Sequence, residues 1–196
     1  MVYFLLQVFQ YMKTPIFFIQ GGGNGGYEAD EKLVASLRSA LGPAYEINYP
    51  QIISDESLKD LGWLQQIGKA ISGIRSETIL VGHSFGASML LKYLSENKII
   101  EKIAGIFLIA TPFWSGKEDW EQDFKLKENF VDHLPANLPT YFYHCKDDEE
   151  ISFDNLSLYQ QKLPQAIFRE INNGGHQLNN DLKIVANDIK ALRRSK

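Results

Sequence analysis

Short apolar runs alternate with helix-like segments along almost the whole chain, and this alternation is the strongest constraint on its fold. The runs are rich in β-branched and aromatic residues and several are continuously apolar, which is typical of strands buried on both faces of a parallel sheet. The expected strands are 15–20, 44–49, 78–82, 103–109, 140–144 and 166–171. The expected helices are 28–41, 56–72, 85–97, 153–163 and 180–193.

Strands that alternate with helices require right-handed crossover connections. The pattern therefore predicts a three-layer α/β/α sandwich with a mainly parallel sheet of about six strands. One connection, 111–138, is much longer than the usual few residues and is rich in aromatic side chains. We expect residues 12–196 to form one domain that carries this stretch as a short helical, cap-like insertion.

The first twelve residues, MVYFLLQVFQYM, are apolar but too few to cross a bilayer, which takes about 20 residues. A signal peptide would carry positive charge before the apolar run, whereas the first charge here is Lys13. We expect Met12 to be the physiological start and residues 1–11 to be an N-terminal extension. The other interpretation of this segment is an edge strand or helix packed on the domain.

The charge balance and the cysteine count exclude several classes of protein. The chain of 196 residues has 20 Lys and Arg against 24 Asp and Glu, a formal charge of −4, so we expect no nucleic-acid partner. One cysteine makes neither an internal disulfide nor a cysteine-rich zinc site. We expect a cytoplasmic protein with no membrane span.

A glycine-rich loop, Gln20-Gly21-Gly22-Gly23-Asn24-Gly25-Gly26, follows the first expected strand and precedes a helix. It fits the G-x-G-x-x-G pattern of dinucleotide binding, and Glu46 stands where an acid could bind a ribose. Three interpretations remain open: a pyrophosphate site, one wall of an oxyanion hole, or a tight turn. The loop lacks the Gly-Lys-Ser/Thr ending of a P-loop, which excludes that kind of nucleotide hydrolysis.

The pentapeptide Gly82-His83-Ser84-Phe85-Gly86 has the form G-x-S-x-G and lies between an expected strand and an expected helix. This arrangement predicts a nucleophile elbow, in which a strained turn presents the serine hydroxyl at the helix start. The flanking glycines are needed because side chains there would collide with the turn. The Phe85 N–H would point to where an oxyanion forms.

A serine hydroxyl needs a base, and the base needs an orienting acid. Of the four histidines, His176 lies in a loop after the last expected strand, where sites of parallel sheets collect. His144 ends an expected strand, and we expect it to be a half-buried side chain with its hydrogen bonds satisfied. The acid is Asp147 or Asp148, which follow the fifth expected strand, so the chain order is Ser, Asp, His.

These motifs together resemble the α/β-hydrolase superfamily, in particular the small serine hydrolases that include the retinoblastoma-binding hydrolase and its short bacterial relatives. The resemblance covers about residue 14 to the C-terminus and implies a reduced α/β-hydrolase fold. The family frame G-x-x-D-x-x-V-P aligns with residues 145–152 and favours Asp148 over Asp147, although Cys145 and Ser152 depart from it. It also implies that Phe85 and Gly22, or Gly23 in place of Gly22, supply the oxyanion hole.

The expected function is a serine hydrolase that forms an acyl-enzyme on Ser84 and cleaves esters, thioesters included, of small to medium substrates. Asp148 and His176 complete the expected triad, and no metal or cofactor is expected. Three insertion aromatics are expected to bind substrate, or else to pack on the core: Phe113, Trp114 and Trp120. The alternatives are an amide-cleaving enzyme, a non-catalytic protein-binding module of the same fold, and a nicotinamide-dependent oxidoreductase.

Overall fold

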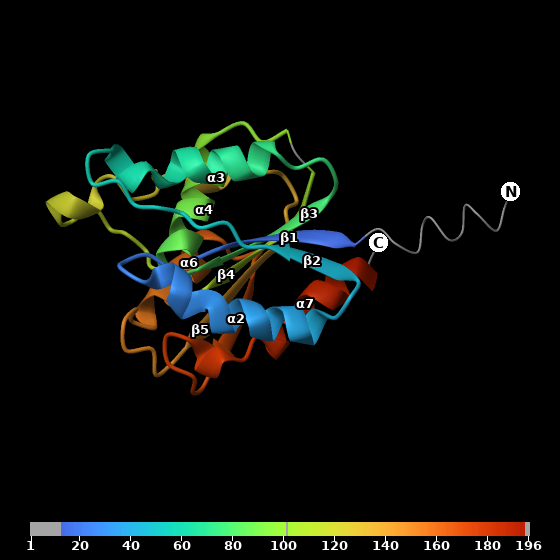
Figure 1. Cartoon of the computed structure of the whole chain (residues 1–196). Coiled ribbons are helices and arrows are strands. Elements are labelled where there is room, and N and C mark those ends of the chain that lie inside the picture. The colour runs from blue at the N-terminus through green and yellow to red at the C-terminus, as the bar shows by residue number, and fades with distance from the viewer. Residues whose placement is uncertain (1–12, 101, 195–196) are drawn as a thin grey trace, which may run out of the picture.

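A six-stranded, wholly parallel sheet forms the centre of the molecule in a computed structural model that describes residues 13–100 and 102–194 (Figure 1). Its order is β2-β1-β3-β4-β5-β6, with every neighbouring pair parallel. The strands are β1 (Thr14–Ile19), β2 (Tyr45–Asn48), β3 (Thr78–His83), β4 (Ile103–Ile109), β5 (Thr140–Cys145) and β6 (Ile167–Ile171). The predicted strands and the predicted sandwich are confirmed.

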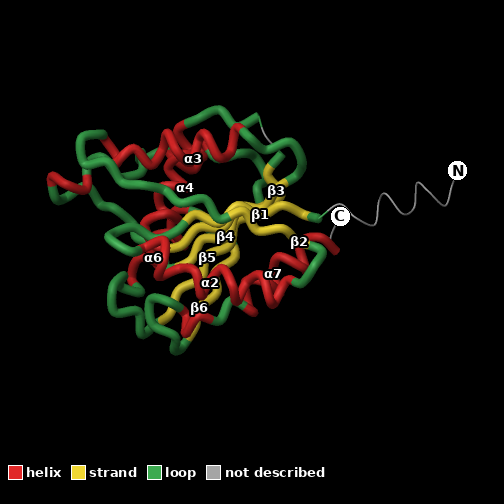
Figure 2. Tube along the Cα trace, in the orientation of Figure 1, coloured by secondary structure: helices red, strands yellow, loops and turns green. Residues whose placement is uncertain are grey.

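Two hydrophobic cores lie on opposite faces of the sheet, because successive strand side chains point to opposite sides. One face is covered by α2 (Gly26–Leu41) and α7 (Lys183–Arg194), and the other by α3 (Trp63–Ser72), α4 (Ser84–Glu96) and α6 (Asp154–Lys162) (Figures 1 and 2). The central strand β3 is buried along its full length, which explains its continuous apolar sequence.

Helix α3 begins at Trp63, seven residues later than the sequence predicts. Asp60 and Leu61 have positive φ, of 48° and 54°, and Gly62 follows at 73°, so the chain cannot run as a helix through them. A 3-10 turn, η1 (Lys59–Gly62), stands there instead. Residues 56–62 therefore do not form the predicted first turns of the helix, and this part of the prediction is wrong.

The sheet order creates a crevice between β1 and β3. The chain leaves β1 toward α2 on one face of the sheet and leaves β3 toward α4 on the other. In open α/β sheets, ligands bind at such a switch point, outside the carboxyl ends of the strands. The glycine-rich loop follows β1 and Ser84 follows β3, so the fold brings both to this crevice.

The long insertion leaves the sheet between β4 and β5 and contains two short helical segments, η2 (Asp119–Glu121) and α5 (Phe130–His133). Its buried Phe130 packs in the core on the α4 side. The expected extension at residues 1–11 lies outside the described residues. Within residues 13–100 and 102–194, no helix is long and apolar enough to cross a membrane.

Candidate active site

Ser84 sits on a sharp turn between β3 and α4 and has a φ of +50°, a left-handed conformation that side chains rarely adopt. The turn is possible because two positions of the pentapeptide, Gly82 and Gly86, have no side chain where neighbouring backbone comes very close. A Cβ on Gly82 would lie 2.7 Å from the Cα of Ala87, and one on Gly86 would overlap the carbonyl oxygen of Gln20. The sequence therefore holds Ser84 at the tip of a strained elbow.

His176 lies in the loop after β6, and its ring is buried. Its Nδ1 is 3.0 Å from Oδ2 and 3.1 Å from Oδ1 of Asp148, in the loop after β5. Asp147 points elsewhere, since its carboxylate accepts the backbone N–H groups of Gly174 and Gly175. Of the two candidate acids, Asp148 is therefore the one that contacts the imidazole.

The Asp148 carboxylate is completely buried, yet several groups satisfy its oxygens. The N–H groups of Glu150 and Ile151 donate to Oδ1, at 3.0 and 2.9 Å. Nε2 of His144 lies 3.3 Å from Oδ2 and donates to the carbonyl of Ile151 at 2.8 Å. His144 is thus fully buried beside Asp148, not half-buried as expected from the sequence.

These contacts set the charges of the pair. Burial by itself would raise the pKa of Asp148, but hydrogen bonds from His144, His176 and Ile151 hold the pKa of that carboxyl well below its usual range. Burial opposes the charged form of His176, whereas the Asp148, Glu150 and Asp30 carboxylates favour it and raise the pKa of His176 above its ordinary value of 6.5. Asp148 is therefore a carboxylate anion, and His176 beside it is a stronger base than an ordinary histidine.

A cavity of about 210 Å³ brings the elbow, the histidine loop and the glycine-rich loop together. Ser84 and His176 both line it, as do Gly21, Gly22 and Glu150. Among the described residues, the Ser84 hydroxyl makes no hydrogen bond, and Nε2 of His176 lies 3.6 Å from the exposed Glu150 carboxylate. The nucleophile and the base thus face one solvent space.

The glycine-rich loop presents free backbone donors to this space. The Gly21 N–H is used, because it donates to Asp30 at 2.7 Å. Within the described chain, no protein group accepts the N–H of Gly22 or of Phe85. These two residues touch, since a Cβ on Gly22 would lie 2.9 Å from that of Phe85. The glycine-rich loop therefore packs directly against the start of α4 at these two residues.

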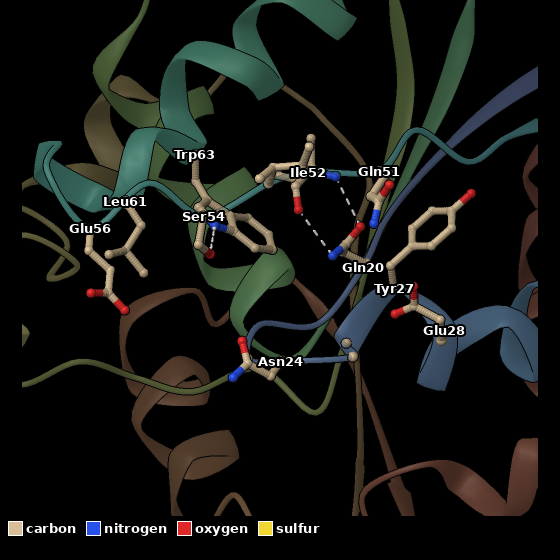
Figure 3. Close-up of a pocket in the computed structure, with 14 residues that line it drawn as sticks. Gln20, Asn24, Tyr27, Glu28, Gln51, Ile52, Ser54, Glu56, Leu61 and Trp63 are labelled. Carbon is tan, nitrogen blue, oxygen red and sulfur yellow. Dashed lines mark hydrogen bonds between the residues drawn. The ribbon is translucent and has the colours of Figure 1, made fainter.

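A second cavity, of about 350 Å³, lies along the same loop and shares Asn24, Gly25 and Gly26 with the first (Figure 3). Gln20 fastens its wall through two hydrogen bonds with the backbone of Ile52, at 3.0 and 3.2 Å. The other side chains labelled in Figure 3 are a mixture of apolar, amide, hydroxyl and acidic groups: Tyr27, Glu28, Gln51, Ser54, Glu56, Leu61 and Trp63.

The three insertion aromatics expected at the substrate line neither of these cavities. Trp114 donates its indole N–H to the Ser88 hydroxyl and stacks edge-on with Trp120 at 5.4 Å. Phe113 packs edge-on against Tyr159 at 5.1 Å. Their substrate contact stays a prediction, while their packing role is visible.

One contact beside the site, between Asp30 and His83, was not predicted from the sequence. Asp30 stands on the apolar stripe of α2, with Leu33, Val34 and Leu37, and pairs with His83 inside the protein. A lone acid on such an apolar stripe indicates a buried partner.

Within the described residues, no group of three or more His, Cys, Asp or Glu side chains could hold a metal ion.

Comparison with known proteins places these residues in context. A family model described as "Serine hydrolase" matches residues 37–182, which include the elbow, Asp148 and His176. Comparison with the curated proteins finds no match.

Solved structures share the fold at low sequence identity. The ydeN gene product of B. subtilis is 16% identical, with a TM-score of 0.67 over 94% of this chain and 100% of that one. The esterase domain of a Rhodothermus marinus protein is 15% identical, with a TM-score of 0.66 over 93% and 86%. Est1E from Butyrivibrio proteoclasticus is 13% identical, with a TM-score of 0.68 over 94% and 88%. At these identities the likeness shows the fold alone.

Proposed function

This chain belongs to the serine hydrolase family, and from that premise we propose that it hydrolyses carboxylic esters, thioesters included, through an acyl-enzyme on Ser84. The single observation that carries the proposal is the shared cavity of Ser84 and His176, with Asp148 hydrogen-bonded behind the imidazole at 3.0 Å. An acid, a base and a hydroxyl in that relation are the parts that acyl transfer requires.

In the proposed reaction, His176 Nε2 takes the proton of the Ser84 hydroxyl as Oγ attacks the carbonyl carbon. Catalytic hydrogen bonds are often open in the free enzyme, so we infer that the Oγ–Nε2 bond forms with substrate in place. Asp148 holds the imidazole in the tautomer with a proton on Nδ1 and stabilises the imidazolium.

The free N–H groups of Phe85 and Gly22 are proposed to bind the oxyanion of the tetrahedral intermediate. One such donor is typically worth about 3–4 kcal/mol of activation free energy. The imidazolium then protonates the leaving alcohol or thiol, which departs and leaves the acyl group on Ser84. Water attacks the acyl-enzyme with His176 again as base, and the acid product leaves.

Two further observations support esters of small to medium size. The cavities of about 210 and 350 Å³ have room for a short acyl chain and a modest leaving group. Structural neighbours include the Rhodothermus esterase domain and a thioesterase domain from the curacin biosynthetic pathway, which favours oxygen and thiol esters over amides.

The test is covalent labelling. Purified protein treated with a fluorophosphonate is expected to gain one adduct by intact mass, and Ser84→Ala is expected to gain none. Turnover of 4-nitrophenyl acetate and of an acyl thioester, with little turnover of the matching 4-nitroanilide, is the expected substrate pattern. A folded wild type that gains no adduct would favour the non-catalytic binding module, and faster anilide cleavage would favour an amidase.

A further inference from the structure

We infer that Asp30 and His83 act as a positioning pair for acyl transfer, tying the glycine-rich loop and the loop of His176 to the nucleophile elbow. Neither residue has a part in the triad, and the inference rests on the proposed function of Ser84. The side chains of both are 1% exposed. A buried acid–imidazole pair is costly unless its hydrogen bonds are satisfied, so its contacts are informative.

The Asp30 carboxylate is the centre of this network. Its Oδ2 accepts the N–H of Gly21 at 2.7 Å and lies 2.9 Å from Nδ1 of His83. Its other oxygen accepts the Gln177 amide at 3.2 Å. One side chain of α2 therefore joins the glycine-rich loop, the elbow and the residue next to His176.

The second ring nitrogen of His83 completes the link. Nε2 lies 3.1 Å from the backbone carbonyl oxygen of His176, and the two rings are 4.8 Å apart. The carbonyl oxygen can only accept a hydrogen bond, so Nε2 of His83 is the donor in this contact. His83 thereby fixes the backbone of the proposed base.

The three segments joined by the pair carry all the proposed reacting groups. Gly21 precedes Gly22, whose N–H is proposed to bind the oxyanion, and His83 precedes Ser84 directly. The held carbonyl belongs to His176 itself. Without the pair, the oxyanion donor, the nucleophile and the base would no longer be held in fixed positions relative to one another. A misplacement of about 1 Å can lower the rate by about 10²-fold.

Both side chains border the cavity of Ser84 but are 1% exposed and act through the groups that they hold, so the loss of the pair is expected to lower kcat more than it changes KM. Asp30→Asn and His83→Gln are each expected to lower kcat for 4-nitrophenyl acetate by about 10- to 100-fold, with KM within about threefold of wild type. The double variant is expected to fall little further than the worse single variant, because the two side chains act as a unit.

Asp188→Asn is the matched control, because Asp188 also binds three donors and lies outside both cavities. It accepts Arg169 at 2.8 and 3.0 Å and the Tyr143 hydroxyl at 2.8 Å. A purely structural role for Asp30 would make Asp30→Asn behave like Asp188→Asn, with lower stability and an unchanged kcat per folded molecule. Folded protein is counted by far-UV circular dichroism and by the fraction that the fluorophosphonate labels at completion.

Should neither Asp30→Asn nor His83→Gln fold, Gln177→Met removes one donor of the network from a half-buried position, and a fall in kcat of about threefold or more is expected. An unchanged kcat in the folded variants overturns the inference. A wild type without Ser84 labelling overturns the proposed function instead, so the two failures are distinct.

Discussion

The imidazole Nδ1 of His176 lies 3.0 Å from Oδ2 of Asp148, although the two residues are 28 positions apart in the chain. The link joins the loops that follow β5 and β6, neighbouring strands of the sheet. The carboxylate is anchored by backbone N–H groups of its own loop, so its position does not depend on the histidine.

Asp148→Asn is expected to lower kcat by about 10³- to 10⁴-fold, because an amide no longer holds the Nδ1-protonated tautomer or stabilises the imidazolium. Asp147→Asn is the neighbouring control. It loses charge-assisted bonds to Gly174 and Gly175 but leaves the imidazole contact, so a loss below about tenfold is expected. Steady-state kinetics on 4-nitrophenyl acetate check both, and a larger loss for Asp147→Asn would exchange the roles of the two acids.

The low-pH side of the kcat/KM profile should shift to lower pH when Glu150 loses its charge. His176 works as a base only when neutral, and nearby carboxylates raise its pKa above 6.5, so kcat/KM is expected to fall as the pH drops through that raised pKa. Glu150→Gln removes one of these carboxylates and lowers the pKa of His176, so activity should persist to lower pH. Profiles of kcat/KM from about pH 5 to 9 measure this. The control is Glu128→Gln, an exposed acid of the insertion that lines neither cavity, and its profile should not shift.

The strain at Ser84 should appear as a gain in stability when it is relieved. A left-handed non-glycine residue costs about 1–2 kcal/mol, and glycine returns part of this through its larger unfolded-state entropy. Ser84→Gly is therefore expected to raise the free energy of unfolding by about 0.5–1 kcal/mol above that of Ser84→Ala, which keeps the strained conformation. Urea denaturation of the two inactive variants gives the comparison, and equal midpoints would contradict a strained elbow.

Gly86 should tolerate no side chain, because its Cβ would overlap the carbonyl oxygen of Gln20. That carbonyl cannot easily move, since the Gln20 side chain is fastened to Ile52. Gly86→Ala is expected to destabilise the protein by about 1–3 kcal/mol. Gly73→Ala is the control, because Gly73 ends α3 with ordinary helical φ and a Cβ there would make only ordinary van der Waals contacts. The free energy of unfolding of this variant should change by less than about 1 kcal/mol.

The sheet could be predicted from the sequence because strands that are buried on both faces have continuous apolar sequences, as β3 and β4 do. The start of α3 could not, because Asp60 and Leu61 are both compatible with a helix and yet have positive φ. A leucine rarely adopts that conformation, so its residue type gives no signal, and the following Gly62 is the clearest local signal.

The candidate site was predictable in part for a similar reason. The Ser84 elbow is local in sequence, and the order of strands places Asp148 and His176 at the same edge of the sheet. The pairing of Asp30 with His83 spans 53 positions and depends on how α2 packs over the sheet. The spacing of two residues in the sequence does not predict a contact of this kind, and it follows only from the three-dimensional structure.

The charge of the two cavities should select among substrates. Among the described residues that line them, none is lysine or arginine, whereas Glu28, Glu56 and Glu150 are exposed carboxylates. A negatively charged wall repels an anionic acyl group, and the repulsion weakens as salt screens it. The monoester of 4-nitrophenol with succinic acid is therefore expected to have a lower kcat/KM than 4-nitrophenyl butyrate, by about two- to tenfold at low salt.

Replacing Glu28 and Glu56 by glutamine should bring the kcat/KM values of the two esters closer together. The control is Glu31→Gln, which changes an exposed acid of α2 outside both cavities and should leave the ratio of the two values unchanged. A ratio that neither salt nor the double variant alters would mean that this wall does not meet the acyl group.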